Sequence, residues 1–110
     1  MKQGEIWNMY LNPVKGSEKR GNRPAVIISG NMLNKYLEVV IVCPLTTKIK
    51  NYKGNVILNP SNKNGLKEIS EVLTFHLRSV SKERLGSKIG QMSFEELNTI
   101  KATLNDILRF

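Results

Sequence analysis

Short apolar segments separated by polar turns make up most of the chain, and they predict a sheet of short strands. Residues 24–29 and 38–45 are rich in β-branched side chains and are bounded by turn-forming residues, which is typical of buried strands. Residues 4–11 alternate loosely between apolar and polar positions and predict a first strand. Weaker patterns predict short strands at 55–58 and 71–73, edge strands or a helical turn at 77–80 and 88–90, and a helical turn at 31–36.

The clearest pattern is a helix at residues 94–109. Ser93 and Glu96 have the spacing of a capping box, in which the serine hydroxyl accepts from the Glu96 amide and the glutamate reaches back. Met92 before the cap and Leu97 after it fit a hydrophobic staple. Apolar side chains recur at helical spacing at Leu97, Ile100, Leu104, Ile107 and Leu108. Because isolated helices of this length are marginal, we expect the helix to pack on the sheet.

Strands followed by one packed helix predict an α+β fold built on a small curled antiparallel sheet. The 110 residues are expected to form one domain over residues 1–110, and 40% hydrophobic content is that of a globular protein. No apolar run approaches the roughly 20 residues that cross a bilayer, so a soluble, cytoplasmic protein with no membrane partner is expected. The single cysteine, Cys43, lies in an apolar segment and is expected in the core.

Positive charge is in excess and is unevenly distributed. Seventeen Lys and Arg residues against nine Asp and Glu residues give a formal net charge of +8. Residues 39–67 contain five lysines and no carboxylate. A basic surface attracts polyanions such as nucleic acids, although charge alone separates neither RNA from DNA nor specific from non-specific binding.

The scarcity of catalytic side chains restricts the chemistry. His76 is the only histidine and Cys43 the only cysteine, so one chain cannot assemble a zinc site from them, and no metal or cofactor is expected. The sequence contains no phosphate-binding glycine loop and no nucleophile elbow. RNA cleavage is compatible with such a chain, because the 2′-hydroxyl is the nucleophile and the protein need only align it and stabilise the transition state. DNA lacks that hydroxyl.

Arg23 and Thr46 are the first candidates for such a site. Arg23 lies where a polar loop meets an apolar strand at Pro24, so its guanidinium could hold a phosphate. The alternative is a surface arginine before a proline. Thr46 follows a buried strand, and its hydroxyl could bind a phosphate oxygen while Lys48 adds positive charge. The alternative is an ordinary threonine at the end of a strand.

Further side chains have both a functional and a structural interpretation. Glu18, in the loop before Arg23, could accept a proton or orient the arginine, or it could be a solvated carboxylate. Its neighbour Ser17 is a candidate for substrate contact. His76 could move protons or contact a base, although a lone histidine is more often structural. Trp7 could stack on a base, or it could lie in the core or in a dimer interface.

Several motifs occur in an order that matches one known family. The motifs are Gly4-Glu5-Ile6-Trp7, Leu11-Asn12-Pro13, Gly16-Ser17-Glu18, Arg23-Pro24-Ala25, Pro44-Leu45-Thr46-Thr47 and Leu77-Arg78-Ser79-Val80. The capped helix follows them at the C-terminal end. In this order the chain resembles, over nearly its whole length, the MazF/PemK family of bacterial toxins.

The resemblance implies an SH3-like small antiparallel β-barrel with a C-terminal helix, the fold of MazF and CcdB toxins, and it implies a homodimer. It implies metal-independent, sequence-specific cleavage of single-stranded mRNA to 2′,3′-cyclic phosphate and 5′-hydroxyl ends. It also implies a MazE-like antitoxin that lays an acidic segment over the RNA groove. Carried over to this chain, the catalytic pair is Arg23 and Thr46. Ser17, Glu18 and Lys48 are supporting candidates for contact with the RNA substrate.

The chain departs from the family pattern at residues 72–76, which are expected to form a strand. Another branch of the family draws its acid and base from an arginine and an aspartate there, whereas this chain has Leu73 and Phe75. His76 stands where many members have glutamine, so we expect it to contact or choose an RNA base.

Two alternative functions remain. A CcdB-like DNA gyrase poison is disfavoured, because such proteins act through C-terminal residues including a tryptophan and this chain ends in Arg109-Phe110. A non-catalytic RNA-binding module is compatible with the basic loops.

Overall fold

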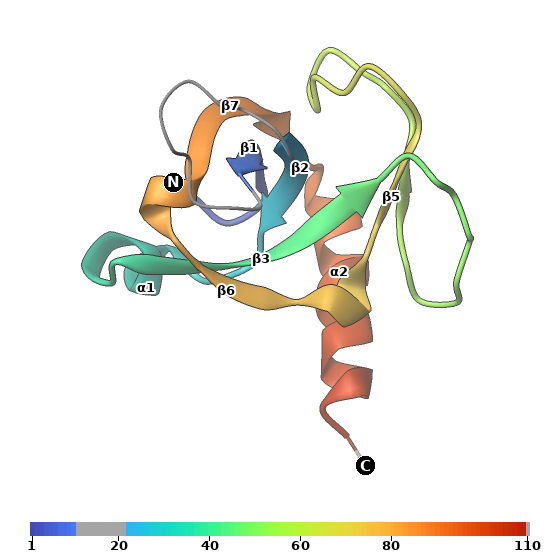
Figure 1. Cartoon of the computed structure of the whole chain (residues 1–110). Helices are drawn as coiled ribbons and strands as arrows, with labels where there is room; N and C mark the ends of the chain where they lie inside the picture. The colour runs from blue at the N-terminus through green and yellow to red at the C-terminus, as the bar shows by residue number, and fades with distance from the viewer. Residues whose placement is uncertain (11–21, 110) are drawn as a thin grey trace.

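The computed structural model describes residues 1–10 and 22–109, which form a curled antiparallel sheet with one long helix packed on it (Figure 1). Among these residues, the strands are β1 (Glu5–Tyr10), β2 (Asn22–Ile27), β3 (Val39–Thr46), β4 (Ile57–Leu58), β5 (Ser70–Val72), β6 (Arg78–Ser81) and β7 (Leu85–Gln91). The helices are α1 (Asn31–Tyr36) and α2 (Phe94–Ile107), with 3₁₀ turns η1 (Thr74–His76) and η2 (Lys82–Arg84). The predicted α+β fold is confirmed.

Strand β3 is the centre of the sheet. The strand order is β4-β5-β3-β2-β1-β7, with β6 also paired to β3, and all of these pairs are antiparallel. One edge of β3 pairs with β2. The other edge is shared, because residues 39–42 pair with β6 and residues 45–46 pair with β5. The sheet therefore divides near the C-terminal end of β3, which is where Thr46 lies.

Both faces of the central strands are buried, which explains their nearly continuous apolar sequences. On one face α2 and the loop before β5 cover a cluster of Ile6, Val26, Ile28, Cys43, Leu45, Leu58, Leu66, Val72, Met92, Leu97 and Ile100. On the other face the curl of the sheet encloses Met9, Ala25, Ile27, Val40, Val42, Val80 and Leu85. The core position predicted for Cys43 is confirmed, and burial raises the pKa of its thiol to about 12.

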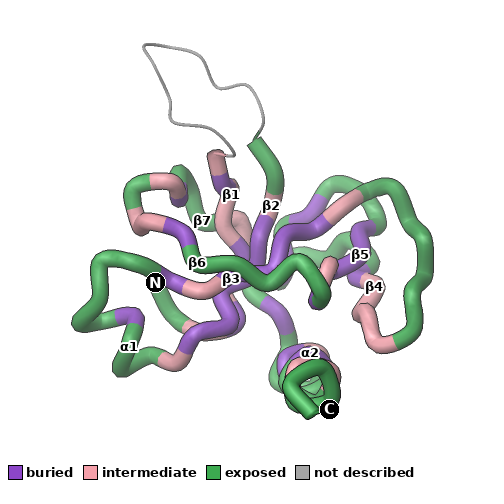
Figure 2. The backbone as a smooth tube through the Cα atoms, turned by 60° about the horizontal axis from the view of Figure 1, so that its bottom comes forward, coloured by how far each residue is buried: buried purple, intermediate pink, exposed green. Residues whose placement is uncertain are grey.

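Helix α2 begins with the predicted capping box. The Ser93 hydroxyl accepts from the Glu96 amide at 3.1 Å, and the Glu96 carboxylate accepts from the Ser93 amide at 2.9 Å. Leu97 and Ile100 are buried against the sheet, but Leu108, just past the helix end, is 83% exposed. Figure 2 shows the helix nearly along its axis, with its buried side toward the sheet and its C-terminal end exposed. Within the described residues, neither helix has the length and apolar character of a membrane span.

Two predicted segments differ from the structure. Residues 72–76 are not a strand, because β5 ends at Val72 and the chain then turns through η1. The Leu73 amide still donates to the Pro44 carbonyl of β3 at 2.8 Å, and the turn is then closed by the His76 amide, which donates to the Leu73 carbonyl at 3.0 Å. Strand β7 is also longer than the segment predicted at 88–90, since it pairs with β1 along most of its length through two irregularities in register.

Candidate functional site

The register of β2 and β3 brings Arg23 and Thr46 to the same end of the sheet. The two strands pair from Ile27 opposite Val42 to Ala25 opposite Pro44. Arg23 lies two residues before Ala25 on β2, and Thr46 lies two residues after Pro44 on β3, so both are just beyond the paired residues. Because the two strands are antiparallel, the beginning of β2 and the end of β3 lie at the same end of the sheet. Arg23 is exposed and Thr46 is half-buried, so this end of the sheet is open to a ligand.

The hydroxyl of Thr46 is held by the loop that follows it. Its oxygen accepts a hydrogen bond from the Lys48 amide at 3.1 Å, which leaves the hydroxyl proton available to another acceptor. Lys48 itself is exposed, as are Lys50 and Lys53 further along the loop. Residues 46–53 therefore carry the Thr46 hydroxyl and three exposed lysines, groups that suit contact with a phosphate backbone.

A buried carboxylate, that of Glu71, organises this loop. Glu71 lies on β5 directly opposite Thr46 and is fully buried. One carboxylate oxygen accepts from the amides of Lys50 at 2.7 Å and Asn51 at 2.8 Å. The other oxygen accepts from the Tyr52 amide at 3.0 Å and from the Asn55 side chain at 2.8 Å. Burial alone would raise the pKa of Glu71, but these four donors outweigh it and lower the pKa, so the carboxylate stays ionised.

Sequence reasoning missed the role of Glu71. The available signal was a single carboxylate in the short strand predicted at 71–73, because an unpaired charge is rarely buried in a strand. The pattern alone could not identify its partners. They lie 16 to 21 positions earlier in the chain, in a loop with no periodicity.

The other predicted site residues fall in different places. Ser17 and Glu18 lie outside the described residues. His76 is exposed on η1, five residues after Glu71 in the sequence. Trp7 packs against the apolar cluster inside the curl, and its indole N–H donates to the Glu5 carboxylate at 3.0 Å. For Trp7 the structure therefore favours the structural interpretation over base stacking.

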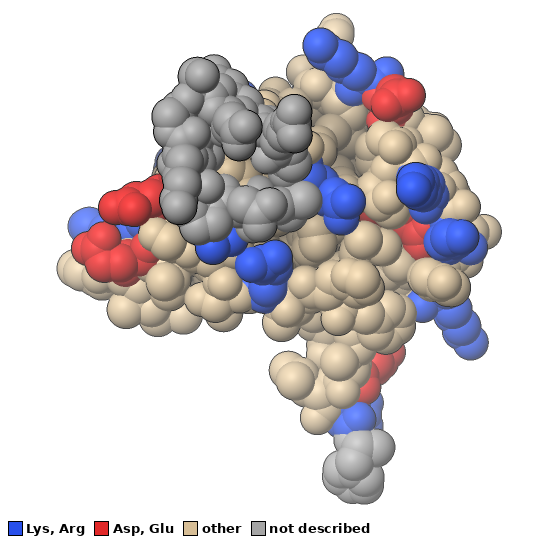
Figure 3. Space-filling view, viewed as in Figure 1, with Lys and Arg blue, Asp and Glu red and all other residues tan. Residues whose placement is uncertain are grey.

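Two cavities border these residues. A cavity of about 330 Å³ is lined by the immediate neighbours of the two first candidates, Pro24 and Thr47, together with Asn8, Gly65, Leu66, Lys67, Glu68, Ser70 and Ile89. A second cavity of about 430 Å³ is lined by His76 with Tyr52, Lys53, Asn55, Leu73 and Phe75. Figure 3 shows Lys and Arg side chains spread over the face that carries β3, β6 and the loops beside β5, with most visible Asp and Glu toward its margins.

The sequence as a whole matches a known family model. Residues 2–108 match the family described as PemK-like, MazF-like toxin of type II toxin-antitoxin system. The chain belongs to this family. Among curated PemK/MazF relatives, it is 34% identical to Endoribonuclease MazF9 of Mycobacterium tuberculosis, over 94% of this chain and 92% of that protein. It is also 34% identical to Endoribonuclease toxin MazF of Escherichia coli K12, over 94% of this chain and 88% of that protein.

Solved MazF structures have the same fold. MazF of Deinococcus radiodurans superposes with a TM-score of 0.78 at 26% identity, covering 98% of this chain and 96% of the other. An endoribonuclease of a mycobacterial species, solved in complex with its cognate antitoxin, superposes with a TM-score of 0.80 at 22% identity, covering 100% and 98% of the two chains. The predicted MazF-like fold is thus confirmed for this PemK/MazF toxin.

Proposed function

We propose that this toxin is a metal-independent, sequence-specific endoribonuclease that cleaves single-stranded mRNA and thereby inhibits translation. The proposal is supported by membership of the PemK/MazF family and by relatives named as endoribonucleases. The observation that supports the site is the antiparallel pairing of β2 and β3, because the beginning of β2, with Arg23, and the end of β3, with Thr46, lie at the same end of the sheet.

In the proposed reaction the ribose 2′-hydroxyl attacks the adjacent phosphorus and the 5′-oxygen leaves, giving a 2′,3′-cyclic phosphate and a 5′-hydroxyl. Arg23 is the group that binds the non-bridging phosphate oxygens and neutralises the charge that grows on them. The Thr46 hydroxyl donates to the same phosphate and helps to align it. Lys48 adds positive charge, and Ser17, Glu18 and His76 remain predicted contacts of the RNA.

The proposed partners follow from charge and from exposed apolar surface. A MazE-like antitoxin with an acidic segment would compete with RNA for the basic face. A homodimer would cover apolar side chains such as Leu77 and Leu108, which are 42% and 83% exposed in the single chain. The toxin is proposed to act in the cytoplasm, where mRNA is translated.

A gyrase poison is not favoured, since the relatives reported above are named as endoribonucleases. A silent RNA-binding module differs from the proposal only in chemistry. Both are separated from it by incubating the purified protein with RNA in the presence of a chelator, because only a metal-independent nuclease shortens the RNA.

The test of the site is Arg23→Ala. We expect it to lower kcat/KM for RNA cleavage at least about 100-fold, because loss of one preorganised donor to a developing anion costs that much in well-studied enzymes. Arg109→Ala is the matched control, since Arg109 is an exposed arginine just past α2. A substrate with 2′-deoxyribose at the cleaved nucleotide should remain intact with either protein.

Full activity of a folded Arg23→Ala variant would remove Arg23 from the mechanism. Cleavage of the 2′-deoxy substrate would remove the internal nucleophile. RNA that stays intact with the unaltered protein would remove the proposed function itself.

A further inference from the structure

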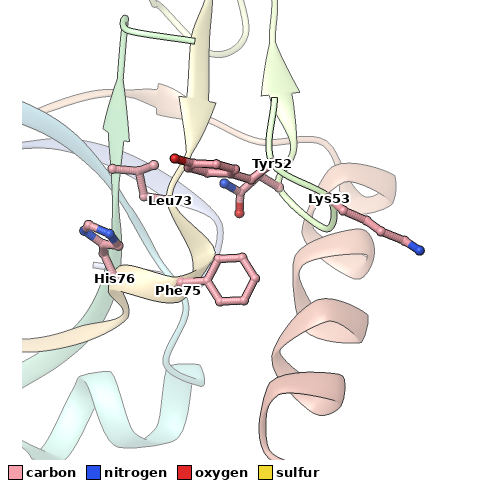
Figure 4. A pocket seen from close by; sticks show the side chains of 6 residues that line it. Tyr52, Lys53, Leu73, Phe75 and His76 are labelled. Carbon is pink, nitrogen blue, oxygen red and sulfur yellow. The ribbon is translucent and has the colours of Figure 1, made fainter. Parts of the chain in front are cut away.

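The cavity beside His76 has two aromatic walls from different segments. Tyr52 comes from the loop after β3 and Phe75 comes from η1, and their side chains are 56% and 58% exposed. Figure 4 shows the Tyr52 side chain extending toward Leu73, and Phe75 and His76 on neighbouring positions of η1. The volume of about 430 Å³ lies within the range of small-molecule sites. Aromatic side chains that line a cavity of this size are typical of a ligand site.

The two walls are held together by the buried network around Glu71. The Tyr52 amide donates to the Glu71 carboxylate at 3.0 Å, which positions the loop that carries the ring. Asn55 links both sides, because its amide donates to Glu71 at 2.8 Å and its oxygen accepts from the Thr74 amide at 3.2 Å. The cavity is therefore preformed, and a ligand that enters it need not order the loop first.

The charge around the cavity favours a nucleic acid. Lys53 lines it, and Lys48 and Lys50 occupy the same loop. That loop begins at Thr46, which lies opposite Glu71 in the β3–β5 pair. The hydrogen bonds around Glu71 therefore connect the cavity to the strand pair that carries Thr46. The smaller cavity beside Pro24 and Thr47 has no aromatic lining residue, so it lacks a stacking surface.

We propose that the cavity of Tyr52, Phe75 and His76 binds one unpaired base of the RNA, at a fixed distance from the cleaved bond. This inference rests on the proposed function, because it names a base-binding site for the same substrate. The base stacks on an aromatic ring, and the imidazole of His76 is within the cavity to contact a base edge. The phosphates on either side of the base lie along the lysines of the loop.

The experiment combines Tyr52→Leu with removal of single bases from the substrate. Once cleavage ends have been mapped, a set of oligonucleotides carries one abasic nucleotide at each position near the cut. Tyr52→Leu is expected to lower kcat/KM roughly 5- to 150-fold, the range observed for the loss of one stacked base. At one position only, the abasic nucleotide should lower kcat/KM of the unaltered protein by a similar factor. At that position it should cause no further loss of kcat/KM in the Tyr52→Leu variant.

Tyr36→Leu is the matched control, because Tyr36 is 72% exposed on α1 and lines no cavity described above. We expect its activity and its abasic profile to equal those of the unaltered protein. Phe75→Leu should behave like Tyr52→Leu, provided that light scattering shows the same oligomeric state, since Phe75 also lines a second apolar groove beside α2.

The outcomes separate this inference from the function on which it rests. If the protein cleaves RNA but Tyr52→Leu matches Tyr36→Leu at every position, the base site is wrong and the nuclease stands. If the protein does not cleave RNA, the nuclease is wrong, and the base site is judged by binding of oligonucleotides with 2-aminopurine at each position. Fluorescence quenching that disappears in Tyr52→Leu would support the base site, and the absence of such quenching would overturn it.

Discussion

At the scale of single residues, the carboxylate of Glu5 joins three parts of the fold. It accepts from the Lys2 amide at 2.9 Å and from the Trp7 indole at 3.0 Å, and it pairs with the Lys88 ammonium at 3.1 Å. Burial alone would raise its pKa, but these donors and the charge of Lys88 lower it from 4.5 to about 2. The Glu5 side chain is only 12% exposed, so solvent screens these contacts weakly.

Acid should therefore weaken the fold through Glu5. The folded state holds the ionised form, so the contribution is complete above pH 4.5 and is lost as the pH falls toward about 2. Glu5→Gln should lower the free energy of unfolding at pH 7 by at most about 3 kcal/mol, and the difference from the unaltered protein should shrink below pH 4.5. Urea unfolding at several pH values measures it, with the exposed Glu68→Gln as control. A difference that stays constant down to pH 2 would contradict the assignment.

At the scale of elements, the loop between β3 and β4 owes its shape to β5. Glu71 accepts from three consecutive backbone amides, those of Lys50, Asn51 and Tyr52, and Asn51 has a positive φ of 54° that turns the chain around the carboxylate. The basic and aromatic side chains of the loop are thereby presented from a rigid base. This is how a segment without regular structure can carry a defined binding surface.

Glu71→Gln tests that dependence. The glutamine keeps the volume but sets an amide group against backbone N–H donors and removes the charge, so we expect about 3 kcal/mol of lost stability in denaturant unfolding. Glu68→Gln is the control, because Glu68 is exposed and lies three residues before Glu71. It should change the stability little. Glu71→Gln should also weaken RNA cleavage even at temperatures where it is folded, because the loop is no longer held. Unchanged stability would show that the four hydrogen bonds contribute nothing net.

At the scale of the whole molecule, the single chain leaves an apolar groove of about 380 Å³ between the sheet and the end of α2. Its walls include Ile28 and Ile41 from the sheet side and Leu104, Ile107 and Leu108 from the helix side. Leu108 is 83% exposed although it continues the apolar stripe of the helix. A second copy of the chain that covers this groove would account for the stripe extending beyond the sheet.

Leu108→Glu should therefore shift the protein from dimer to monomer. The substitution adds a charge to the groove but removes no contact from the core, so the single chain should keep its circular dichroism spectrum. Light scattering after size exclusion measures the mass. Phe94→Glu is the control, because Phe94 is 75% exposed at the opposite end of α2. A dimer that survives Leu108→Glu would exclude this groove as the interface.

The features that were predictable from the sequence depend on neighbours within a few residues. The capping box of α2 is a contact between Ser93 and Glu96, and it was identified from their spacing. The β-branched segments became β2 and β3 because apolar side chains on both faces require a strand buried on both sides. The motif around Arg23 and Pro24 could be recognised because it consists of residues that are consecutive in the chain.

Only the tertiary structure decided how distant segments meet. Arg23 and Thr46 share one end of the sheet because β2 and β3 pair antiparallel, and the position of Tyr52 depends on a carboxylate 19 residues later in the chain. The strand predicted through Phe75 and His76 is a turn, in which the Thr74 amide donates to the Asn55 side chain and the His76 amide donates to the Leu73 carbonyl. The periodicity of a sequence shows which side chains avoid water. Strand register and buried hydrogen bonds depend instead on contacts between residues far apart in the chain, which no local pattern specifies. For that reason most of the helices and strands could be predicted from the sequence, and the shape of the site could not.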